Sequence, residues 1–161
     1  MKIEITNLSK NFKDVNILND VNVTFLPNHI YGLSGKNGSG KTVFLKLLCG
    51  FYYPTTGEIK YNGNILDSRF FYPPNTRALI ENPDFIPDLT GFENLKLLAD
   101  IEKKITDEDI LKAMDIVNIK TEKDKKFGKY SLGMKQKLGL AEVIMENPDI
   151  MIFDEPLNGL D

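Results

Sequence analysis

The residues best suited to chemistry form a glycine-rich stretch, residues 35–42, with the sequence GKNGSGKT. This phosphate loop fits the pattern G-x-x-x-x-G-K-[ST], in which glycines let backbone N–H groups point at the β- and γ-phosphates of a nucleotide. Lys41 would place a positive charge beside the same oxygens, and the Thr42 hydroxyl would bind Mg²⁺. The pattern predicts a nucleotide site formed by Gly35, Asn37, Gly38, Ser39, Gly40, Lys41 and Thr42.

Two acidic residues at the end of an apolar run give a second group of candidates. Ile150–Phe153 reads IMIF and is followed directly by Asp154 and Glu155. A run of this length favours a central strand covered on both faces, and acids at its carboxyl end would lie where open α/β sheets bind ligands. We therefore expect Asp154 to hold Mg²⁺ beside Thr42, and Glu155 to polarise an attacking water as a general base.

The phosphate loop needs a strand before it and a helix after it. Ile30–Leu33 is apolar enough for the strand, and Thr42–Leu48 has an apolar helical pattern that Gly50 closes. Elsewhere in the first 65 residues, alternation of polar and apolar side chains predicts half-buried strands, and an Asn-Gly pair predicts a hairpin turn. These segments are Lys2–Ile5, Asn22–Phe25, Glu58–Tyr61 and the turn at Asn62 and Gly63.

From residue 88 onward the chain is predicted to be helical. Two capping-box pairs stand ahead of apolar residues at helical spacing, namely Thr90 with Glu93 and Thr106 with Asp109. A third helix is expected from about Ser131 to about Met145. The densely charged segment Thr121–Lys129, which precedes it, is interpreted as a solvated connector.

The composition restricts other kinds of chemistry. One cysteine, Cys49, and one histidine, His29, exclude an internal disulfide and most histidine-based zinc sites, and neither residue is assigned a functional role. The net charge of −3 argues against a general nucleic-acid-binding protein. No apolar run approaches the roughly 18 residues of a membrane span, and the N-terminus lacks a secretory signal, so a cytoplasmic protein is expected.

Residues 130–137, YSLGMKQK, resemble the signature motif LSGGQxQR of the ATP-binding cassette (ABC) ATPases. The match is at Ser131, Gly133 and Gln136. Independently of the name, Ser131 suits a helix N-cap, and Gly133 would let a phosphate approach the first turn of the following helix. The resemblance implies that Ser131 and Gly133 meet the nucleotide held by a second ATP-binding subunit, head to tail.

Two further segments strengthen the resemblance to ABC ATPases. Residues 155–161, EPLNGLD, are similar to the family's EPTxGLD, with Leu157 in place of threonine. Residues 79–95 resemble its Q-loop region, with Glu81 in the place of the usual glutamine. Glu81 would then bind Mg²⁺ through a metal-bound water, sense the membrane partner, or do both. Phe12 matches the aromatic residue that stacks on adenine in the family.

The resemblance implies an α/β fold: a P-loop NTPase core of the ABC type with an antiparallel β subdomain and an inserted helical subdomain. The nucleotide core would combine residues 27–55 with 146–161, and the antiparallel β subdomain would combine residues 1–30 with 56–80. The helical subdomain carrying the signature would span residues 88–145. Family members continue with further core strands and a histidine that contacts the γ-phosphate, so we expect the C-terminal part of the domain to be missing here.

The function implied is Mg²⁺-dependent ATP binding and hydrolysis that drives an ABC transporter, with Glu155 and Lys41 as catalytic residues. The motif variants resemble those of bacterial ATPases that export antibiotics and antimicrobial peptides. A separate transmembrane permease and a location on the inner face of the membrane follow from this resemblance. Two alternatives stay open: a non-transport ABC ATPase acting in translation or DNA repair, and a catalytically inactive nucleotide-binding fragment. Residues 1–161 alone are expected to be inactive.

Overall fold

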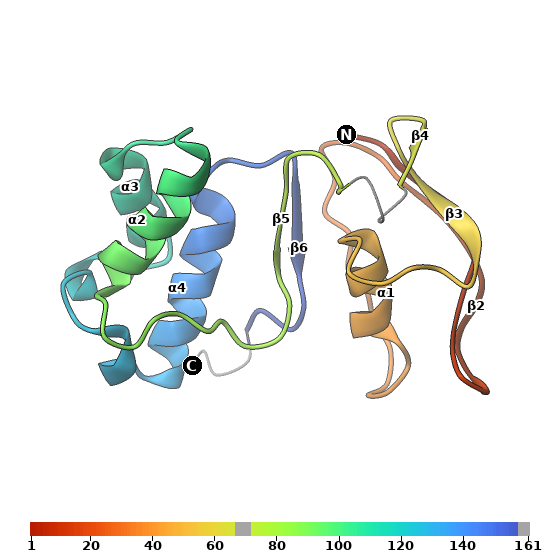
Figure 1. Cartoon of the computed structure of the whole chain (residues 1–161), viewed down its shortest axis with the longest axis horizontal. Helices are drawn as coiled ribbons and strands as arrows, with labels where there is room; N and C mark the ends of the chain where they lie inside the picture. Colours follow the sequence, from red (N-terminus) through yellow and green to blue (C-terminus); the bar gives the residue numbers. More distant parts are fainter. Residues whose placement is uncertain (67–71, 158–161) are drawn as a thin grey trace. The chain divides into compact units, whose positions relative to one another are not determined.

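The chain divides into two compact units, Met1–Thr76 and Arg77–Asp161. The computed structural model describes residues 1–66 and 72–157. In Figure 1, the first unit consists mainly of long strands and one helix, whereas the second is mainly helical. The phosphate loop therefore belongs to the first unit, and the signature-like motif and the acidic pair belong to the second.

The first unit contains a four-stranded sheet in the order β2-β1-β3-β4. All neighbouring strands pair antiparallel, as predicted, although the first two strands are longer than the alternating pattern indicated. The turn between the last two strands has positive φ at both Asn62 (48°) and Gly63 (82°), which is what an Asn-Gly hairpin turn requires. The strands are β1 Ile3–Phe12, β2 Val15–Phe25, β3 Thr56–Tyr61 and β4 Asn64–Ile65.

Helix α1, Lys41–Leu48, follows the phosphate loop within one residue of the predicted start. Its N-cap, Gly40, has a φ of 91°, and a Cβ there would lie 2.9 Å from a methyl carbon of Ile17 in β2. Glycine is therefore required both by the backbone and by the space available. At the other end of the helix, the Tyr61 hydroxyl of β3 donates a 2.6 Å hydrogen bond to the carbonyl of Leu48. These contacts hold both ends of α1 against the sheet.

Cys49 and His29, to which the sequence assigns no functional role, lie at the end of α1 and in a loop. Cys49 follows α1 and is 5% exposed, and burial raises the pKa of its thiol to about 12. The thiol is therefore protonated at neutral pH and packs as a small apolar group. His29 lies in a loop, where its Nδ1 is 2.8 Å from the carbonyl oxygen of Pro27.

The strand predicted at Ile30–Leu33 is wrong, because these residues form no strand in the structure. A strand requires a neighbour that shares backbone hydrogen bonds, and no strand ladder to this segment is present in the described part of Met1–Thr76. The apolar side chains are accordingly exposed, with Ile30 fully accessible and Tyr31 47% exposed. Apolar composition alone did not identify the partner that a strand needs.

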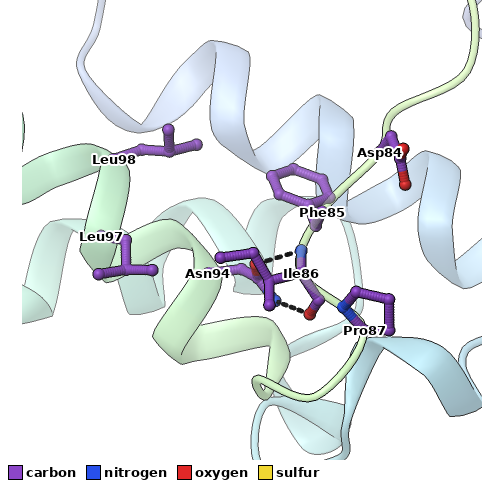
Figure 2. A pocket seen from close by; sticks show the side chains of 7 residues that line it. All are labelled: Asp84, Phe85, Ile86, Pro87, Asn94, Leu97 and Leu98. Atoms are coloured by element: carbon purple, nitrogen blue, oxygen red, sulfur yellow. Dashed lines mark hydrogen bonds between the residues drawn. The ribbon is translucent and has the colours of Figure 1, made fainter.

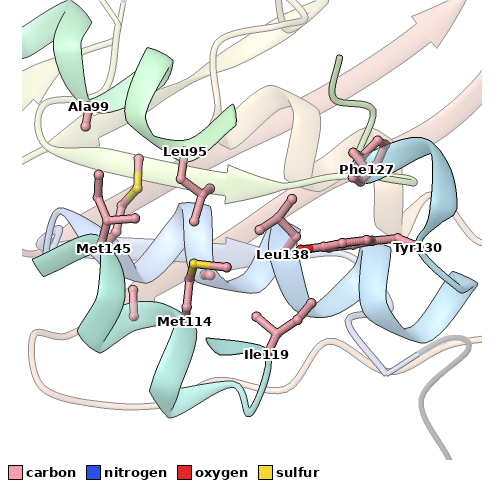
Figure 3. Close-up of a cluster of buried hydrophobic side chains, with 11 residues drawn as sticks. Leu95, Ala99, Met114, Ile119, Phe127, Tyr130, Leu138 and Met145 are labelled. Carbon is pink, nitrogen blue, oxygen red and sulfur yellow. The ribbon is translucent and has the colours of Figure 1, made fainter. Parts of the chain in front are cut away.

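The second unit is built on three helices: α2 Gly91–Glu102, α3 Asp107–Ile116 and α4 Leu132–Met145. Figure 3 shows side chains from these helices and from the segment before α4 meeting in one buried cluster. The third helix lies where the sequence predicted it. The members of the cluster are Leu95, Ala99, Ile110, Ala113, Met114, Ile119, Phe127, Tyr130, Leu138, Ala141 and Met145.

The connector before α4 is not simply solvated, which corrects the prediction for Thr121–Lys129. It contains the short 3-10 turns η1 Lys120–Glu122 and η2 Phe127–Lys129. Phe127 is 2% exposed, and its ring meets that of Phe85 edge to face at 5.2 Å. One aromatic residue among many charges is enough to anchor the segment, since burying it removes a large apolar area from water.

A two-stranded sheet, β5 Thr76–Leu79 with β6 Ile150–Phe153, lies beside these helices in the second unit. Arg77 forms ion pairs with Glu146, just after α4, and with Glu102 of α2 at 3.3 Å, so β5 is tied to both helices. In β6, Ile152 is buried but Met151 is 43% exposed. The expectation that this run is covered on both faces is therefore only half right.

Both predicted capping boxes are present. The Thr90 hydroxyl accepts a hydrogen bond from the Glu93 N–H, and the Glu93 carboxylate accepts one from the Thr90 N–H. Thr106 and Asp109 form the same reciprocal pair at the start of α3. Hydrogen bonds from the Thr106 N–H and hydroxyl, and then one from Lys112, lower the pKa of Asp109 to about 2. The first turn of α3 thus depends on an ionised carboxylate.

We expect Asp109→Asn to remove part of the acid sensitivity of the second unit. Because the folded-state pKa lies below the usual 3.8, ionised Asp109 stabilises the fold above that pH, and this contribution is lost as the pH falls towards about 2. Urea unfolding at several pH values between 2 and 5 should give a shallower loss of unfolding free energy for the variant. Asp115→Asn, in the same helix but outside the capping box, is the control. Equal slopes for Asp109→Asn and the unaltered protein would contradict the assignment.

Candidate nucleotide site

The phosphate loop is closed by its own lysine. The Lys41 ammonium donates hydrogen bonds to the carbonyl oxygens of Gly35 (3.0 Å) and Lys36 (3.2 Å), and the Ser39 N–H donates to the Lys36 carbonyl at 3.1 Å. The charge predicted to meet phosphate oxygens is therefore held over the loop. Lys41 sits at the first position of α1, where it can reach both the loop and an anion bound to it.

The phosphate loop is open at Gly38 and tightly closed at Gly35. Gly38 has a φ of 79°, and a Cβ there would meet nothing within 4 Å, whereas a Cβ on Gly35 would lie 2.6 Å from the Ser39 hydroxyl oxygen. One glycine thus leaves the mouth of the loop open and the other permits its tight closure. Gly40 has no side chain to cap α1, and the first turn of α1 holds no acid, so its N–H groups and positive helix end suit an anion.

Phe12 lies at the end of β1 with a defined set of neighbours. Its ring is 40% exposed and is met edge to face by Tyr52 at 5.3 Å, while the Lys10 ammonium lies 4.8 Å from the ring centroid. Phe12 pairs with Val15 across the hairpin, two residues before Ile17, which packs on Gly40. Two residues of strand span about 7 Å, so one hairpin carries both the aromatic ring and the floor of the phosphate loop.

Three carboxylates follow the ends of β5 and β6. The Asp154 N–H donates a 2.9 Å hydrogen bond to the carbonyl of Leu79, so the residues after each strand start from neighbouring positions. Glu81 and Glu155 both have left-handed backbone conformations, with φ of 66° and 47°. The structure therefore brings the predicted metal residues Glu81 and Asp154 to the same end of this sheet as the predicted base Glu155.

The predicted metal ligands of this set are carboxylates, a ligand type that Mg²⁺ uses in proteins. Among the described residues, no group of three or more His, Cys, Asp and Glu forms a metal site. Mg²⁺ ordinarily uses one or two carboxylates together with water and phosphate oxygens. Glu81 and Asp154, the two carboxylates predicted as ligands, are of the kind that this requirement describes.

The N-terminus of α4 presents the signature-like residues. Ser131 caps the helix, as predicted, and its hydroxyl accepts a 3.2 Å hydrogen bond from the Met134 N–H. Ser131 is exposed, Leu132 is 60% exposed, and Gly133 follows in the first helical turn. Further along the helix, Gln136 is buried and its side chain donates to the carbonyl of Pro156 at 3.2 Å. The helix start is thus accessible, whereas its second turn is fixed inside the unit.

Sequence reasoning missed the role of Asn94. Its side chain accepts from the Ile86 N–H at 2.9 Å and donates to the carbonyls of Ile86 (3.1 Å) and Thr90 (3.0 Å), although it is only 3% exposed. Figure 2 shows this clamp beside a pocket of about 460 Å³. An asparagine in the first turn of a helix gives no sequence signal for a partner eight residues upstream. The pocket is lined by Asp84, Phe85, Ile86, Pro87, Asn94, Leu97 and Leu98.

The candidate residues therefore fall into two groups. Phe12 and the phosphate loop, residues 35–42, belong to Met1–Thr76. Glu81, Ser131, Gly133, Asp154 and Glu155 belong to Arg77–Asp161.

Comparison with known proteins identifies the family. The sequence model described as "ABC transporter" matches residues 18–158. The chain belongs to the ABC transporter family. This confirms the resemblance to the ABC family, and the matched range includes the phosphate loop, residues 35–42, and the acidic pair, Asp154 and Glu155.

Curated ABC transporter relatives match along almost the whole chain. It is 42% identical over 159 residues to the uncharacterized ABC transporter ATP-binding protein YybJ of Bacillus subtilis (strain 168), covering 99% of this chain and 73% of that protein. It is 39% identical over 160 residues to the bacitracin transport ATP-binding protein BcrA of Enterococcus faecalis, covering 99% and 52% respectively. The chain thus spans about half the length of BcrA.

Solved ABC structures confirm the predicted α/β fold class. A putative ABC transporter ATP-binding protein from Pyrococcus furiosus superposes with a TM-score of 0.89 and 26% identity, covering 100% of this chain and 78% of that one. The structure of an ATP-binding subunit of an ABC transporter gives a TM-score of 0.84 and 27% identity, covering 100% and 69%. Within the described residues, no helix is both long and apolar enough to cross a bilayer.

Proposed function

We propose that the full-length protein binds and hydrolyses ATP to power an ABC transporter. The observation that carries this proposal is the phosphate loop, whose Lys41 is bonded to two loop carbonyls and whose Gly38 leaves open space above the backbone. A loop of this form, at the uncapped start of α1, suits the β- and γ-phosphates of a nucleotide. Membership of the ABC transporter family supports ATP as that nucleotide.

In the proposed reaction a water attacks the γ-phosphate in line with the leaving oxygen. Lys41 neutralises charge that develops on the phosphate oxygens, and the backbone N–H groups of the loop hold those oxygens in place. Glu155 accepts a hydrogen bond from the water and orients it. Thr42, Asp154 and Glu81 would hold Mg²⁺, which supplies further charge stabilisation when bound.

Phe12 is proposed to stack on the adenine base. Its ring is partly exposed, it is supported from one side by Tyr52 and Lys10, and its hairpin also contacts the phosphate loop. Aromatic stacking contributes to nucleotide binding without a strict demand for hydrogen bonds. Ser131 and Gly133, at the exposed start of α4, are proposed to meet the nucleotide of a second ATP-binding subunit.

The transported compound, the permease partner and the location are proposed from the relatives and from the motif variants. BcrA is a bacitracin transport ATP-binding protein, and the variants of the signature and Q-loop motifs resemble those of ATPases that export antibiotics and antimicrobial peptides. We propose export of a compound of this kind through a separate transmembrane permease, with this subunit on the inner face of the membrane. The net charge of −3 gives no support to nucleic acid as a partner.

A phosphate-release assay on two lengths of the protein tests this proposal. The full-length protein should show Mg²⁺-dependent ATPase activity that Lys41→Ala abolishes, whereas residues 1–161 should show none above buffer. The reason is that catalysis requires positional precision and the facing signature of a well-formed second subunit. Lack of activity in the full-length protein would favour the nucleotide-binding alternative. Activity of residues 1–161 that depends on Lys41 would show that this part is already a complete catalytic unit.

A further inference from the structure

Gln136 is a buried polar side chain whose position calls for a physical explanation. It lies in the second turn of α4 and is 3% exposed. A buried amide is unfavourable unless it is hydrogen-bonded. Its Nε2 meets this requirement by donating to the carbonyl oxygen of Pro156 at 3.2 Å, across 20 residues of sequence. The bond joins the helix that begins at Ser131 to the residue directly after Glu155.

Glu155 has a backbone conformation that its surroundings must maintain. Its φ of 47° lies in the left-handed region, which side chains other than glycine seldom adopt. The proline that follows favours extended conformations at the preceding residue instead. Such strained residues persist only where neighbouring contacts hold them.

The segment containing Glu155 is held on both sides. Before it, the Asp154 N–H donates to the carbonyl of Leu79 in β5 at 2.9 Å. After it, the carbonyl of Pro156 accepts from Gln136. The first contact is an extension of the β5–β6 pairing, whereas the second comes from a helix.

We propose that Gln136 is a positioning residue for Glu155, holding its backbone so that the carboxylate meets the attacking water. This inference rests on the proposed role of Glu155 as the general base. It also gives α4 a mechanical part in the reaction. Ser131 and Gln136 are five residues apart, about 7.5 Å along the helix, so the helix that begins at the signature-like residues also holds the segment after β6.

Gln136→Met tests the proposal, because the methionine side chain has a similar size but no N–H donor. We expect kcat for ATP in the full-length protein to fall about tenfold or more, while KM and the affinity for ATP stay within about twofold. Val143→Ala is the matched control: Val143 is a buried apolar residue of the same helix, and its truncation should lower stability without lowering kcat. A wild-type kcat for Gln136→Met would overturn the proposal. So would an equal loss of kcat in both variants at equal loss of stability.

Gln136→Glu provides a second readout that a merely structural role would not move. The introduced carboxyl can donate to the Pro156 carbonyl when protonated but repels it when ionised. The ratio of its kcat to that of the unaltered protein should therefore rise as the pH is lowered, while the ratio for Gln136→Met stays flat. A flat ratio for Gln136→Glu would overturn the proposal even if Gln136→Met failed to fold.

The same measurements separate this inference from the proposed function. If Glu155→Gln retained wild-type turnover, Glu155 would not be the base and the proposed role itself would be wrong. If Glu155→Gln were inactive while Gln136→Met turned over normally, only the positioning role of Gln136 would be lost.

Discussion

Replacing Glu155 with glutamine is expected to lower ATP turnover of the full-length protein by about 10²–10⁴-fold while ATP binding survives. Glutamine keeps the size of the side chain and most of its hydrogen-bonding reach but cannot act as a base. The effect should appear in kcat, because the lost interaction with water is made in the transition state. Steady-state phosphate release and calorimetric binding of Mg-ATP are the two measurements required. The variant should also accumulate as an ATP-bound dimer on gel filtration.

Asp149→Asn is a close control for that experiment. Asp149 is an exposed acid just before β6, whereas Glu155 follows the other end of this four-residue strand. Asp149→Asn removes a charge of the same sign from beside the other end of β6 without touching the proposed base, so the turnover of this variant should be unchanged. If binding and turnover fell together in Glu155→Gln, Glu155 would be a structural or metal-binding residue instead.

Lys41→Ala is expected to weaken Mg-ATP binding by at least about tenfold, which corresponds to ~1.4 kcal/mol. The variant removes the ammonium that the structure holds over the loop carbonyls of Gly35 and Lys36. Titration calorimetry with Mg-ATP and with inorganic triphosphate measures the effect, and both ligands should lose affinity because both depend on the loop. Unchanged affinity would show that the loop does not hold the phosphates.

Phe12→Ala shows whether the effect of Lys41→Ala is specific to the phosphates of the ligand. If the ring of Phe12 stacks on the base, its removal should weaken ATP binding but leave triphosphate binding unaltered. The pair of variants thus divides the ligand into base and phosphates, and each half is tested by a different residue of the same unit.

The features predicted correctly from the sequence are those whose interacting residues lie close together along the chain. The start of α2 follows from Thr90 and Glu93, and the start of α3 from Thr106 and Asp109, because each partner lies three residues away. Ile30–Leu33 failed for the opposite reason, since a strand depends on a neighbour that its own sequence does not specify. The charged residues around Phe127 favoured an exposed segment, whereas its burial depends on the hydrophobic cluster in which it packs.

The site shows the same division between local and distant partners. Ser131 was recognised as a helix cap because it bonds three residues ahead, to the Met134 N–H. Gln136 matches a family motif, but its hydrogen bond to Pro156 spans 20 residues and no local pattern predicts it. The support of Phe12 by Tyr52 likewise depends on segments 40 residues apart that only the folded chain brings together. Contacts between residues far apart in the sequence could not be predicted from the sequence alone.

The burial of Cys49 at the end of α1 should protect its thiol from oxidation and disulfide exchange. The thiolate is the form that reacts with oxidants and disulfides, and a thiol whose pKa burial raises to about 12 is almost wholly protonated at pH 7. Cys49 is also the one cysteine of these 161 residues, and it directly follows α1. Peroxide, glutathione and thiol-directed reagents should therefore leave Cys49 at the end of this helix unmodified while the domain stays folded.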